Sequence, residues 1–364
     1  MFLTKLSVIN YKNIAEANLE FCQGINCFIG NNGMGKTNIL DAIYYLSFCK
    51  SHTNAIDTQN IKHEEGFLML QGNYRTPQQE EEVYVGLKRG QKKLFKRNKQ
   101  AYERLLDHIG LLPLVLVSPS DAVLIDGGSE ERRKFVDGVI SQYDKKYLDY
   151  LLKYNYLLQQ RNALLKNRTL KEDALYEVCE FQMAQLAQYI FAQRQAFITQ
   201  FLPVFQSYYN AIAQVDEVVN IVYKSHLENG SLQEQFQEYR AKDSLLGYTT
   251  KGVHKDELEM FLGEYFVKRT GSQGQNKTFL VALKLAQFDF LKKIHACNPI
   301  LLLDDIFDKL DATRVNKIIE MVSGDNFGQI FITDTNRDHL VGFLSQLPQS
   351  NRIFSVNEQG VFTD

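Results

Sequence analysis

Runs of apolar residues near the two ends of the chain predict strands that are buried in a sheet. Ile25–Ile29 is short and mostly apolar, and Ile300–Leu303 is wholly apolar and ends in two aspartates. An apolar run of this length is typical of a parallel strand that is covered on both faces. Val215–Tyr223 is rich in Val and Ile and predicts a further strand.

Two stripes of apolar residues predict a helical hairpin in the middle of the chain. Residues 129–166 are expected to form one continuous helix, with Ser129 as its cap and apolar positions three or four residues apart: Val136, Ile140, Tyr143, Tyr147, Leu151, Tyr154 and Leu158. The second stripe has the same spacing, with Arg194 at the position that is not apolar: Cys179, Met183, Leu186, Ile190, Phe197 and Phe201. Residues 167–172 are short enough to fold the second helix back, and Pro203 is expected to bend or end it.

The predicted arm is short, because a helix over residues 129–166 would be about 57 Å long. We interpret both stripes as packing faces. Ser231 and Glu234 have the spacing of a capping box and predict another short helix. The chain is therefore expected to be an α/β protein whose main body is split. Residues 1–128 and 245–364 would form its two lobes, and residues 129–244 an inserted helical subdomain.

Composition narrows the cellular setting. The 364 residues are 45% hydrophobic and 23% charged, which is a globular balance. No apolar run approaches the roughly 20 residues of a membrane span, and the start lacks a signal-peptide pattern, so we expect a cytoplasmic protein without membrane contact. The five cysteines are scattered and contain no Cys-x-x-Cys pair, which indicates reduced thiols rather than disulfides or a zinc site. The net charge of −2 requires any polyanion-binding surface to be local.

A phosphate-binding loop follows the first buried strand. Residues 30–37 match G-x-x-x-x-G-K-[ST] and precede a helical apolar pattern, which is the strand–loop–helix context that this motif needs. Its glycines allow successive N–H groups to face a phosphate. Lys36 is expected to reach the β- and γ-phosphates, and Thr37 to bind Mg²⁺. The predicted ATP-binding residues here are Gly30, Asn31, Asn32, Gly33, Met34, Gly35, Lys36 and Thr37.

Two further motifs lie near the C-terminus. Asp304 at the end of its strand is expected to hold Mg²⁺, and Asp305 to orient or deprotonate the attacking water. Lys36 and Asp304 are 268 positions apart (304 − 36), whereas the two motifs lie much closer in compact P-loop kinases and GTPases. Upstream, Gly-Ser-x-Gly-Gln opens a predicted helix and offers phosphate a second set of N–H donors through Ser272, Gly274 and Gln275.

The order of these motifs, closed by D-x-L-D at residues 308–311, is that of the ABC ATPases, including the SMC heads. Over nearly its whole length the chain closely resembles the RecF family of bacterial recombination mediators. The resemblance rests on the stretches LTKLSVINYKNIAEANLEF, GNNGMGKTNILDAI, VSPSDAVLIDGGSEERRKFVD, KGVHKDELEM, GSQGQNKTFLVALKLAQ and LLLDDIFDKLD. The chain departs from the family where it has Ser120 in place of the more frequent Glu, and Val253-His254-Lys255 in place of Pro-His-Arg.

This resemblance implies an ABC-type P-loop ATPase head with mixed sheets, helices and a short arm. It implies an ATP-dependent homodimer in which ATP lies between two subunits, with Lys36, Asp305 and Ser272 as the catalytic residues. The family binds DNA at gaps and single-strand/double-strand junctions, hydrolyses ATP slowly, and helps to load RecA with RecO and RecR. These properties are expectations for this chain.

A cluster of basic residues is the candidate DNA-binding surface. Residues 88–99 hold seven basic side chains and no acid: Lys88, Arg89, Lys92, Lys93, Lys96, Arg97 and Lys99. Gly90-Gln91 is suited to turn a hairpin at this point. A solvated strand edge explains such a run equally well from sequence alone. The family resemblance favours DNA, with contacts to backbone phosphates rather than to bases.

Three other functions are left as alternatives. A transporter ABC subunit would carry Glu in place of Asp305, and His in place of Asp334. A P-loop kinase would lack Gly-Ser-x-Gly-Gln. A clamp that binds ATP without hydrolysing it would share every motif, so only a measurement of phosphate release separates it from an ATPase.

Overall fold

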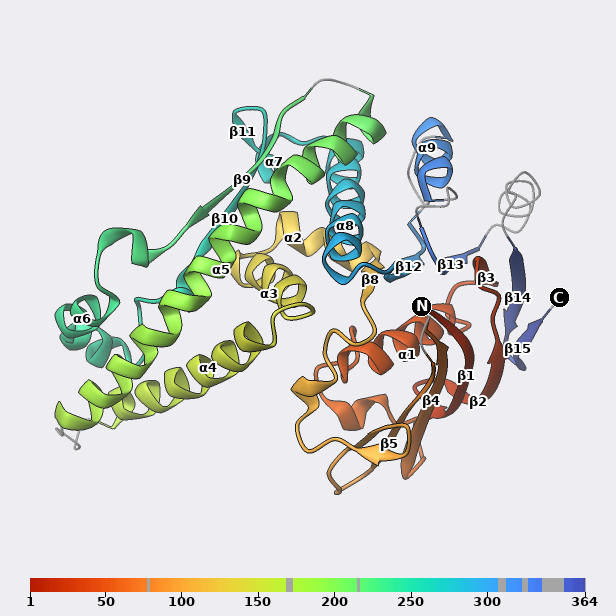
Figure 1. The fold of residues 1–364 in the computed structure, drawn as a ribbon, viewed down its shortest axis with the longest axis horizontal. Coiled ribbons are helices and arrows are strands. Elements are labelled where there is room, and N and C mark those ends of the chain that lie inside the picture. The colour runs from red at the N-terminus through yellow and green to blue at the C-terminus, as the bar shows by residue number, and fades with distance from the viewer. Residues whose placement is uncertain are drawn as a thin grey trace. The chain divides into compact units, whose positions relative to one another are not determined.

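The computed structural model describes residues 1–76, 79–167, 173–214, 217–306, 312–322, 327–335 and 350–363. The chain divides into two compact units (Figure 1). The sheet unit comprises Met1–Asp121 and Gln287–Asp364, and the helical unit comprises Ala122–Ala286. None of the helices described is long and apolar enough to cross a membrane.

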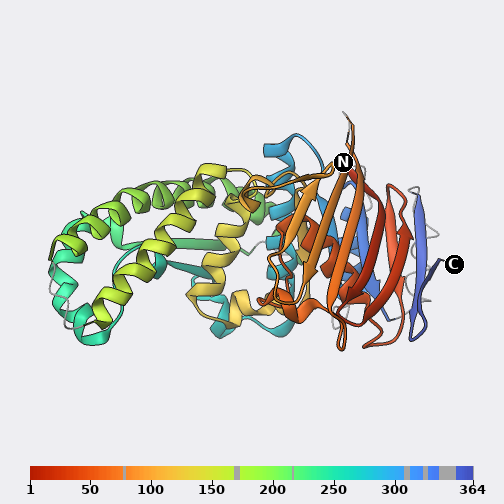
Figure 2. The same cartoon turned by 90° about the horizontal axis from the view of Figure 1, so that it is seen from below.

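The first sheet of the sheet unit is antiparallel, with the strand order β2-β1-β4-β5-β6-β7, and its strands lie side by side in Figure 2. The strands are β1 (Phe2–Tyr11), β2 (Ile14–Glu20), β4 (Phe67–Arg75), β5 (Glu80–Lys88), β6 (Leu94–Arg97) and β7 (Gln100–Ala101). Buried and less buried residues alternate along β4 and β5, as expected where one face of a sheet packs on a core.

The second sheet of this unit has the order β15-β14-β3-β13-β12-β8, and its strands are parallel except for the antiparallel pair β14–β15. The strands are β3 (Ile25–Ile29), β8 (Leu114–Val117), β12 (Ile300–Asp304), β13 (Ile330–Asp334), β14 (Asn351–Asn357) and β15 (Gly360–Thr363). Every residue of β3, β12 and β13 is buried, which confirms the two strands predicted from their apolar runs.

Helix α1 (Lys36–Phe48) contacts strands of both sheets, and together they enclose one hydrophobic core. Phe28, Phe331 and Phe354, on three neighbouring strands, stack within it. The unit also contains α9 (Ala312–Val322), the short 3-10 helices η1 (Asp57–Asn60) and η2 (Leu105–Asp107), and all but the last residue of η3 (Pro119–Ala122). The core therefore fixes the helix that follows the phosphate loop.

The helical unit contains α2 (Val123–Asp126), α3 (Ser129–Ile140), α4 (Lys145–Lys166), α5 (Asp173–Ala213), α6 (Leu232–Leu246), α7 (Val267–Thr270) and the start of α8 (Gln273–His295). Helices α4 and α5 pack side by side as the predicted hairpin (Figure 1), and residues 168–172 between them lie outside the described ranges. The prediction of one continuous helix over residues 129–166 was wrong. The chain breaks after α3, because Asp144 is extended and its carboxylate accepts the Tyr147 N–H, which caps a new helix.

Pro203 does not end α5, contrary to one of the two outcomes predicted for it. A proline inside a helix removes one backbone hydrogen bond and costs about 3 kcal/mol. Phe201, Phe205 and Tyr209 are fully buried on either side of it. Burial of each such side chain contributes roughly 1.5–3 kcal/mol, so packing outweighs the loss.

A small antiparallel sheet completes the helical unit. Its central strand, β10 (Glu257–Leu262), pairs with β9 (Val219–Lys224) on one side and with β11 (Tyr265–Phe266) on the other. Two 3-10 helices, η4 (His226–Asn229) and η5 (Val253–Lys255), flank α6. Ser231 caps α6 through the Glu234 N–H, as predicted. The predicted strand begins at Val219 rather than Val215, which lies outside the described residues. Because β10 pairs with β9, residues 245–286 belong to this unit and not to the sheet unit.

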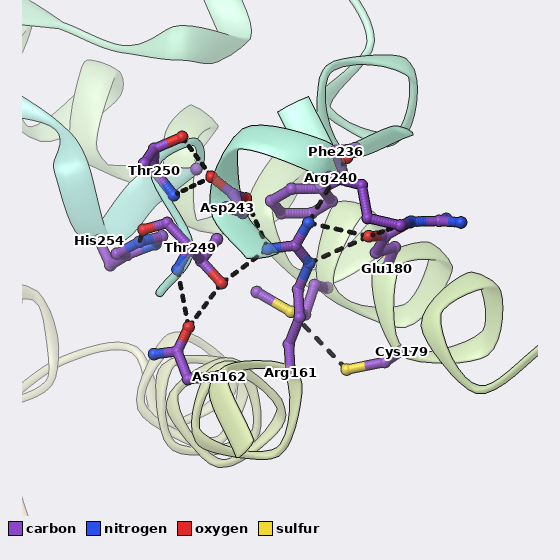
Figure 3. Close-up of polar contacts among 12 residues, drawn as sticks. Arg161, Asn162, Cys179, Glu180, Phe236, Arg240, Asp243, Thr249, Thr250 and His254 are labelled. Carbon is purple, nitrogen blue, oxygen red and sulfur yellow. Dashed lines mark hydrogen bonds and ion pairs between the residues drawn. The ribbon is translucent and has the colours of Figure 1, made fainter. Parts of the chain in front are cut away.

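A buried cluster of charges ties the helical unit together (Figure 3). Arg161 of α4 is fully buried and forms ion pairs with Glu180 of α5 at 2.9 Å and Asp243 of α6 at 2.7 Å. Its guanidinium also donates to the Thr249 hydroxyl, and Arg240 binds the second oxygen of Glu180 at 2.6 Å. Arg194, which interrupts the apolar stripe of α5, likewise pairs with Asp137 and Asp256, so the interruption has a structural role.

Candidate active site

The phosphate loop joins β3 to α1, and three of its glycines are required by its shape. Gly33 and Gly35 have φ angles of +83° and +103°, in the left-handed region that glycine adopts readily. At Gly30 a Cβ atom would lie 2.1 Å from the carbonyl oxygen of Val356 on β14, so no side chain fits there. The backbone of the loop is thus fixed by its glycines and by the neighbouring strand.

Lys36 is the first residue of α1 and is largely buried. Its Nζ atom donates hydrogen bonds to the carbonyl oxygens of Gly30 at 2.6 Å and Asn31 at 3.0 Å. Burial lowers the pKa of Lys36, and the carboxylates of Asp305, Asp304 and Asp334 act in the opposite direction. A buried cation surrounded by loop carbonyls and strand-end acids can bind a phosphate that lies over the loop.

A chain of hydrogen bonds joins the loop to the acids at the ends of β12 and β13. Thr37 Oγ1 donates to Asp304 Oδ1 at 2.9 Å, and Thr333 Oγ1 donates to the same oxygen at 2.7 Å. The backbone N–H of Asp305 donates to Thr333 Oγ1 at 3.0 Å. Asp305 itself has a φ of +49°, which is uncommon for a residue other than glycine and is typical of functional sites. The fold thus brings together two motifs that are 267 positions apart in the sequence.

These groups line a pocket of about 240 Å³ formed by Asn32, Gly33, Gly35, Lys36, Thr37, Asn38, Asp304, Asp305 and Thr333. The described part of the chain holds no cluster of three or more His, Cys, Asp or Glu side chains suited to a metal. Thr37 and Asp304 nevertheless offer one hydroxyl and one carboxylate oxygen, a donor set that fits Mg²⁺ when phosphate and water supply the other ligands.

Sequence reasoning missed two residues of this site. Thr333 is fully buried and contacts both acids, and it stands at the end of an apolar strand one position before Asp334, a signal that could have identified it. Asn13 accepts a hydrogen bond from the Asn38 side chain at 2.7 Å and lies so close to Gly35 that a Cβ there would be 2.7 Å from its amide oxygen. Nothing in the sequence pattern places the turn that carries Asn13 beside the loop.

The predicted second phosphate motif lies in the helical unit, where Ser272 caps α8. Gln275 N–H donates to Ser272 Oγ at 3.2 Å, and Ser272 N–H donates to Gln275 Oε1 at 3.0 Å, which together form a reciprocal capping box. Ser272 is exposed, whereas Gly274 and Gln275 are half-buried. Helix α8 begins at Gln273, inside the motif, so the motif supplies the first-turn N–H groups of the helix. The D-x-L-D residues 308–311 lie outside the described part of the chain.

The predicted basic hairpin exists, because β5 and β6 pair on either side of Gly90. Its seven basic side chains do not form one free surface, however. Lys93 is mostly buried and binds Asp57 at 2.7 Å and the Cys49 carbonyl oxygen at 2.6 Å.

Three further basic residues of the hairpin also contact groups of the sheet unit. Arg97 pairs with Glu81 through two hydrogen bonds, which lower the pKa of Glu81 to about 2. Arg89 donates to the Glu65 carbonyl oxygen, and Lys96 lies over the Tyr84 ring. The most exposed lysines of the cluster are Lys88, Lys92 and Lys99.

Comparison with known proteins agrees with this architecture. Residues 2–347 match the RecF/RecN/SMC N terminal domain family. The chain is 58% identical to the DNA replication and repair protein RecF of Phocaeicola vulgatus over 366 residues, which cover 100% of this chain and 98% of that protein. It is 48% identical to the protein of the same name from Porphyromonas gingivalis, over 364 residues and 100% of both chains.

Solved structures show the same relationship. A structure of the recombination mediator protein RecF-ATP in the RecFOR pathway aligns with a TM-score of 0.89 at 28% identity, over 100% of this chain and 97% of that one. An Smc head bound to the C-winged helix domain of ScpA aligns with a TM-score of 0.60 at 13% identity, which shows a shared fold. The chain therefore belongs to the RecF family of DNA replication and repair proteins.

Proposed function

We propose that this protein is an ATP-dependent DNA-binding protein of DNA repair, recombination and replication restart, which acts at gaps and single-strand/double-strand junctions. The observation that carries the proposal is the hydrogen bond between Thr37 and Asp304, which unites the phosphate loop with the acidic strand end in one pocket. The relatives reported above are DNA replication and repair proteins, and none of those is a transporter subunit. The transporter alternative is therefore dropped.

In this proposal ATP binds over the loop, with Lys36 facing its β- and γ-phosphates. Thr37 and Asp304 would hold Mg²⁺, which neutralises phosphate charge during transfer. Asp305 orients the attacking water, because its carboxylate follows a strained backbone that Thr333 holds in place. Hydrolysis is slow, and DNA stimulates it. Phosphate release measured with and without gapped DNA tests this, and release at the level of a blank would leave only an ATP-binding clamp.

The proposed active form is a homodimer with two shared ATP sites, in which Ser272 of each subunit meets the ATP held by the other. The Gln275 N–H already donates to Ser272 Oγ, so the hydroxyl hydrogen is left to donate to a phosphate oxygen. Since the γ-phosphate adds this bond only in the dimer, ATP favours dimerisation and ADP does not.

The Ser272→Arg variant tests the shared site. It should bind ATP as a monomer with nearly normal affinity, because residues 30–37 are unchanged, and it should not dimerise with ATP. Light scattering paired with nucleotide titration measures both properties. A variant that still dimerises with ATP, or that loses ATP binding as a monomer, would contradict the mechanism.

DNA is proposed to contact the basic hairpin through Lys88, Lys92 and Lys99, the exposed lysines of the cluster. Replacing these three by Gln should flatten the slope of log K against log salt by about 3, from ~0.9 per phosphate contact. The matched control replaces Lys145, Lys153 and Lys166 of α4, which carry the same total charge. Equal slopes for the two triple variants would show that the hairpin does not bind DNA and is only a solvated strand edge. The aligned structure is of a protein of the RecFOR pathway, and RecO and RecR are the proposed protein partners.

A further inference from the structure

Glu217 connects the end of the long helix α5 to the Gly-Ser-x-Gly-Gln motif. Its Oε2 atom accepts a hydrogen bond from the Tyr209 hydroxyl at 2.8 Å, and its Oε1 atom accepts one from Gln275 Nε2 at 3.3 Å. Its backbone carbonyl accepts from Gln206 Nε2 at 2.8 Å. Tyr209 and Gln206 are on α5, so three bonds fix Glu217 between that helix and α8.

The Gln275 side chain links Glu217 to Ser272 through hydrogen bonds at both ends of its amide. While its amide nitrogen donates to Glu217, its amide oxygen accepts the Ser272 N–H. Both ends of the amide are therefore engaged, which leaves one orientation that satisfies both partners. The backbone N–H of Gln275 also donates to Ser272 Oγ, so this oxygen serves α8 as an acceptor and its own hydrogen remains to donate elsewhere.

Aromatic packing brings the same two helices together one turn further along. Phe279 lies four residues after Gln275 and hence on the same face of α8. Its ring meets Phe205 edge-on, with 4.8 Å between ring centroids, and lies 6.3 Å from Tyr209. The end of α5 and the start of α8 thus form one packed corner, with the polar chain from Tyr209 to Ser272 at its edge.

We propose that Glu217 is a positioning residue for ATP-dependent dimerisation. It orients Gln275, and through Gln275 it holds Ser272 ready to donate to the γ-phosphate bound by the partner subunit. This inference rests on the proposed shared ATP site. Because Tyr209 and Gln206 belong to α5, the 41-residue helix of the arm, the same contacts couple the arm to the composite site.

The test compares Glu217→Ala with Glu217→Gln and with Val218→Ala. Val218 is the next residue and its side chain is 62% exposed, which makes it a matched control. Glu217→Ala should weaken ATP-dependent dimerisation roughly tenfold, about threefold for each of the two sites, because the lost hydrogen bond positions Ser272 and does not itself contact the phosphate. Glu217→Gln keeps an acceptor for Gln275 and should lie within about threefold of the wild type. Val218→Ala should match the wild type, and ATP binding by the monomer should be unchanged in all three.

A second variant keeps the proposal testable if Glu217→Ala does not fold. Tyr209→Phe removes only the hydroxyl that holds Glu217, and should weaken dimerisation in the same direction by about threefold. Wild-type dimerisation by folded Glu217→Ala or Tyr209→Phe, alongside a Ser272→Arg variant that stays monomeric, would overturn this inference and leave the proposed function standing. Dimerisation by Ser272→Arg would overturn the proposed function itself.

Discussion

Two buried cations, Lys36 in the sheet unit and Arg161 in the helical unit, show how differently the two units use polar groups. Among the contacts described, the Lys36 ammonium donates to two backbone carbonyl oxygens. The Arg161 guanidinium instead forms ion pairs with the carboxylates of Glu180 and Asp243, both of them buried (Figure 3). Neutral acceptors can be exchanged for a phosphate at little cost, whereas paired charges cannot be separated without leaving a carboxylate buried and alone.

The two cations therefore differ in whether their partners are neutral or charged, and not in whether the cation is buried. The acids Asp304 and Asp305 stand at the open ends of parallel strands, where α/β proteins place their ligands. Glu180 and Asp243 lie between helices and serve to hold α4, α5 and α6 in one arrangement. We infer that the pocket at the phosphate loop keeps charge available for chemistry, while the cluster around Arg161 uses charge for architecture.

Replacing Arg161 by Met is the strongest test of the architectural role. The substitution leaves Glu180 with Arg240 alone, and it removes the only cation paired with Asp243 among the contacts described. The free energy of unfolding should therefore fall by about 3–5 kcal/mol. Hydrogen exchange should accelerate in α4, α5 and α6 while α1 is unaffected. Lys153→Met, on the same helix and in an exposed pair with Asp149, is the control and should change stability by less than about 1 kcal/mol. Equal exchange in the two variants would argue against a structural role for the cluster.

Both units also bury a histidine that is held neutral. The stability of the protein at low pH is therefore a second test of the comparison between the units. His108 in the sheet unit donates from Nε2 to the Leu46 carbonyl oxygen at 2.7 Å and accepts the Tyr102 hydroxyl at Nδ1. His254 in the helical unit makes the same pair of contacts with Thr249 and Tyr154. Burial lowers the pKa of His108 to about 4 and that of His254 to about 3.

We expect His108 to make the protein sensitive to mild acid. Its pKa is lower in the folded chain than in the unfolded one, so the unfolded chain binds more protons between about pH 6.5 and pH 4. The stability it contributes is present above pH 6.5 and falls by about 3 kcal/mol as the pH drops to 4. His108→Gln cannot titrate, and its denaturant midpoint should fall less steeply over this range. Parallel pH profiles for the two proteins would show that His108 is not held neutral.

The sequence predicted the parts of this comparison that depend on neighbouring residues. The strand, loop and helix around Lys36 follow from one continuous stretch, and the apolar run before Asp304 identifies a buried strand. The partners of Arg161 are 19 and 82 positions away, and those of Lys93 include Asp57, 36 positions away, so pattern alone could not pair them. The break between α3 and α4 was missed for a related reason. The apolar spacing continues across it, while the decisive contact is one side chain, Asp144, bound to one backbone N–H.

Lys36→Ala tests the other side of the comparison. If the lysine is held ready for phosphate, its loss should weaken ATP binding roughly 100-fold, since hydrogen bonds to charged groups contribute about 1.5–3 kcal/mol each. The fold should survive, because the lysine donates only to loop carbonyls among the contacts described and not to the core. Nucleotide titration by calorimetry, with circular dichroism as the check on folding, gives the result. Unchanged affinity would remove the phosphate-loop assignment.

The smallest expected effect concerns Thr333, where the two ways of using polar groups meet in one side chain. Its hydroxyl is fully buried, as in the helical unit, yet it donates to Asp304 and accepts from the Asp305 N–H, both of which line the pocket. Thr333→Val keeps the shape and removes both bonds, so Asp304 loses one donor and the strained Asp305 backbone loses its acceptor. We expect the rate of hydrolysis to fall about tenfold, from roughly 1–1.5 kcal/mol of lost positioning, with ATP affinity nearly unchanged. Thr333→Ser retains the hydroxyl and should restore most of the rate. A Ser variant as slow as the Val variant would mean that the methyl group, through packing, and not the hydroxyl sets the geometry of the acids.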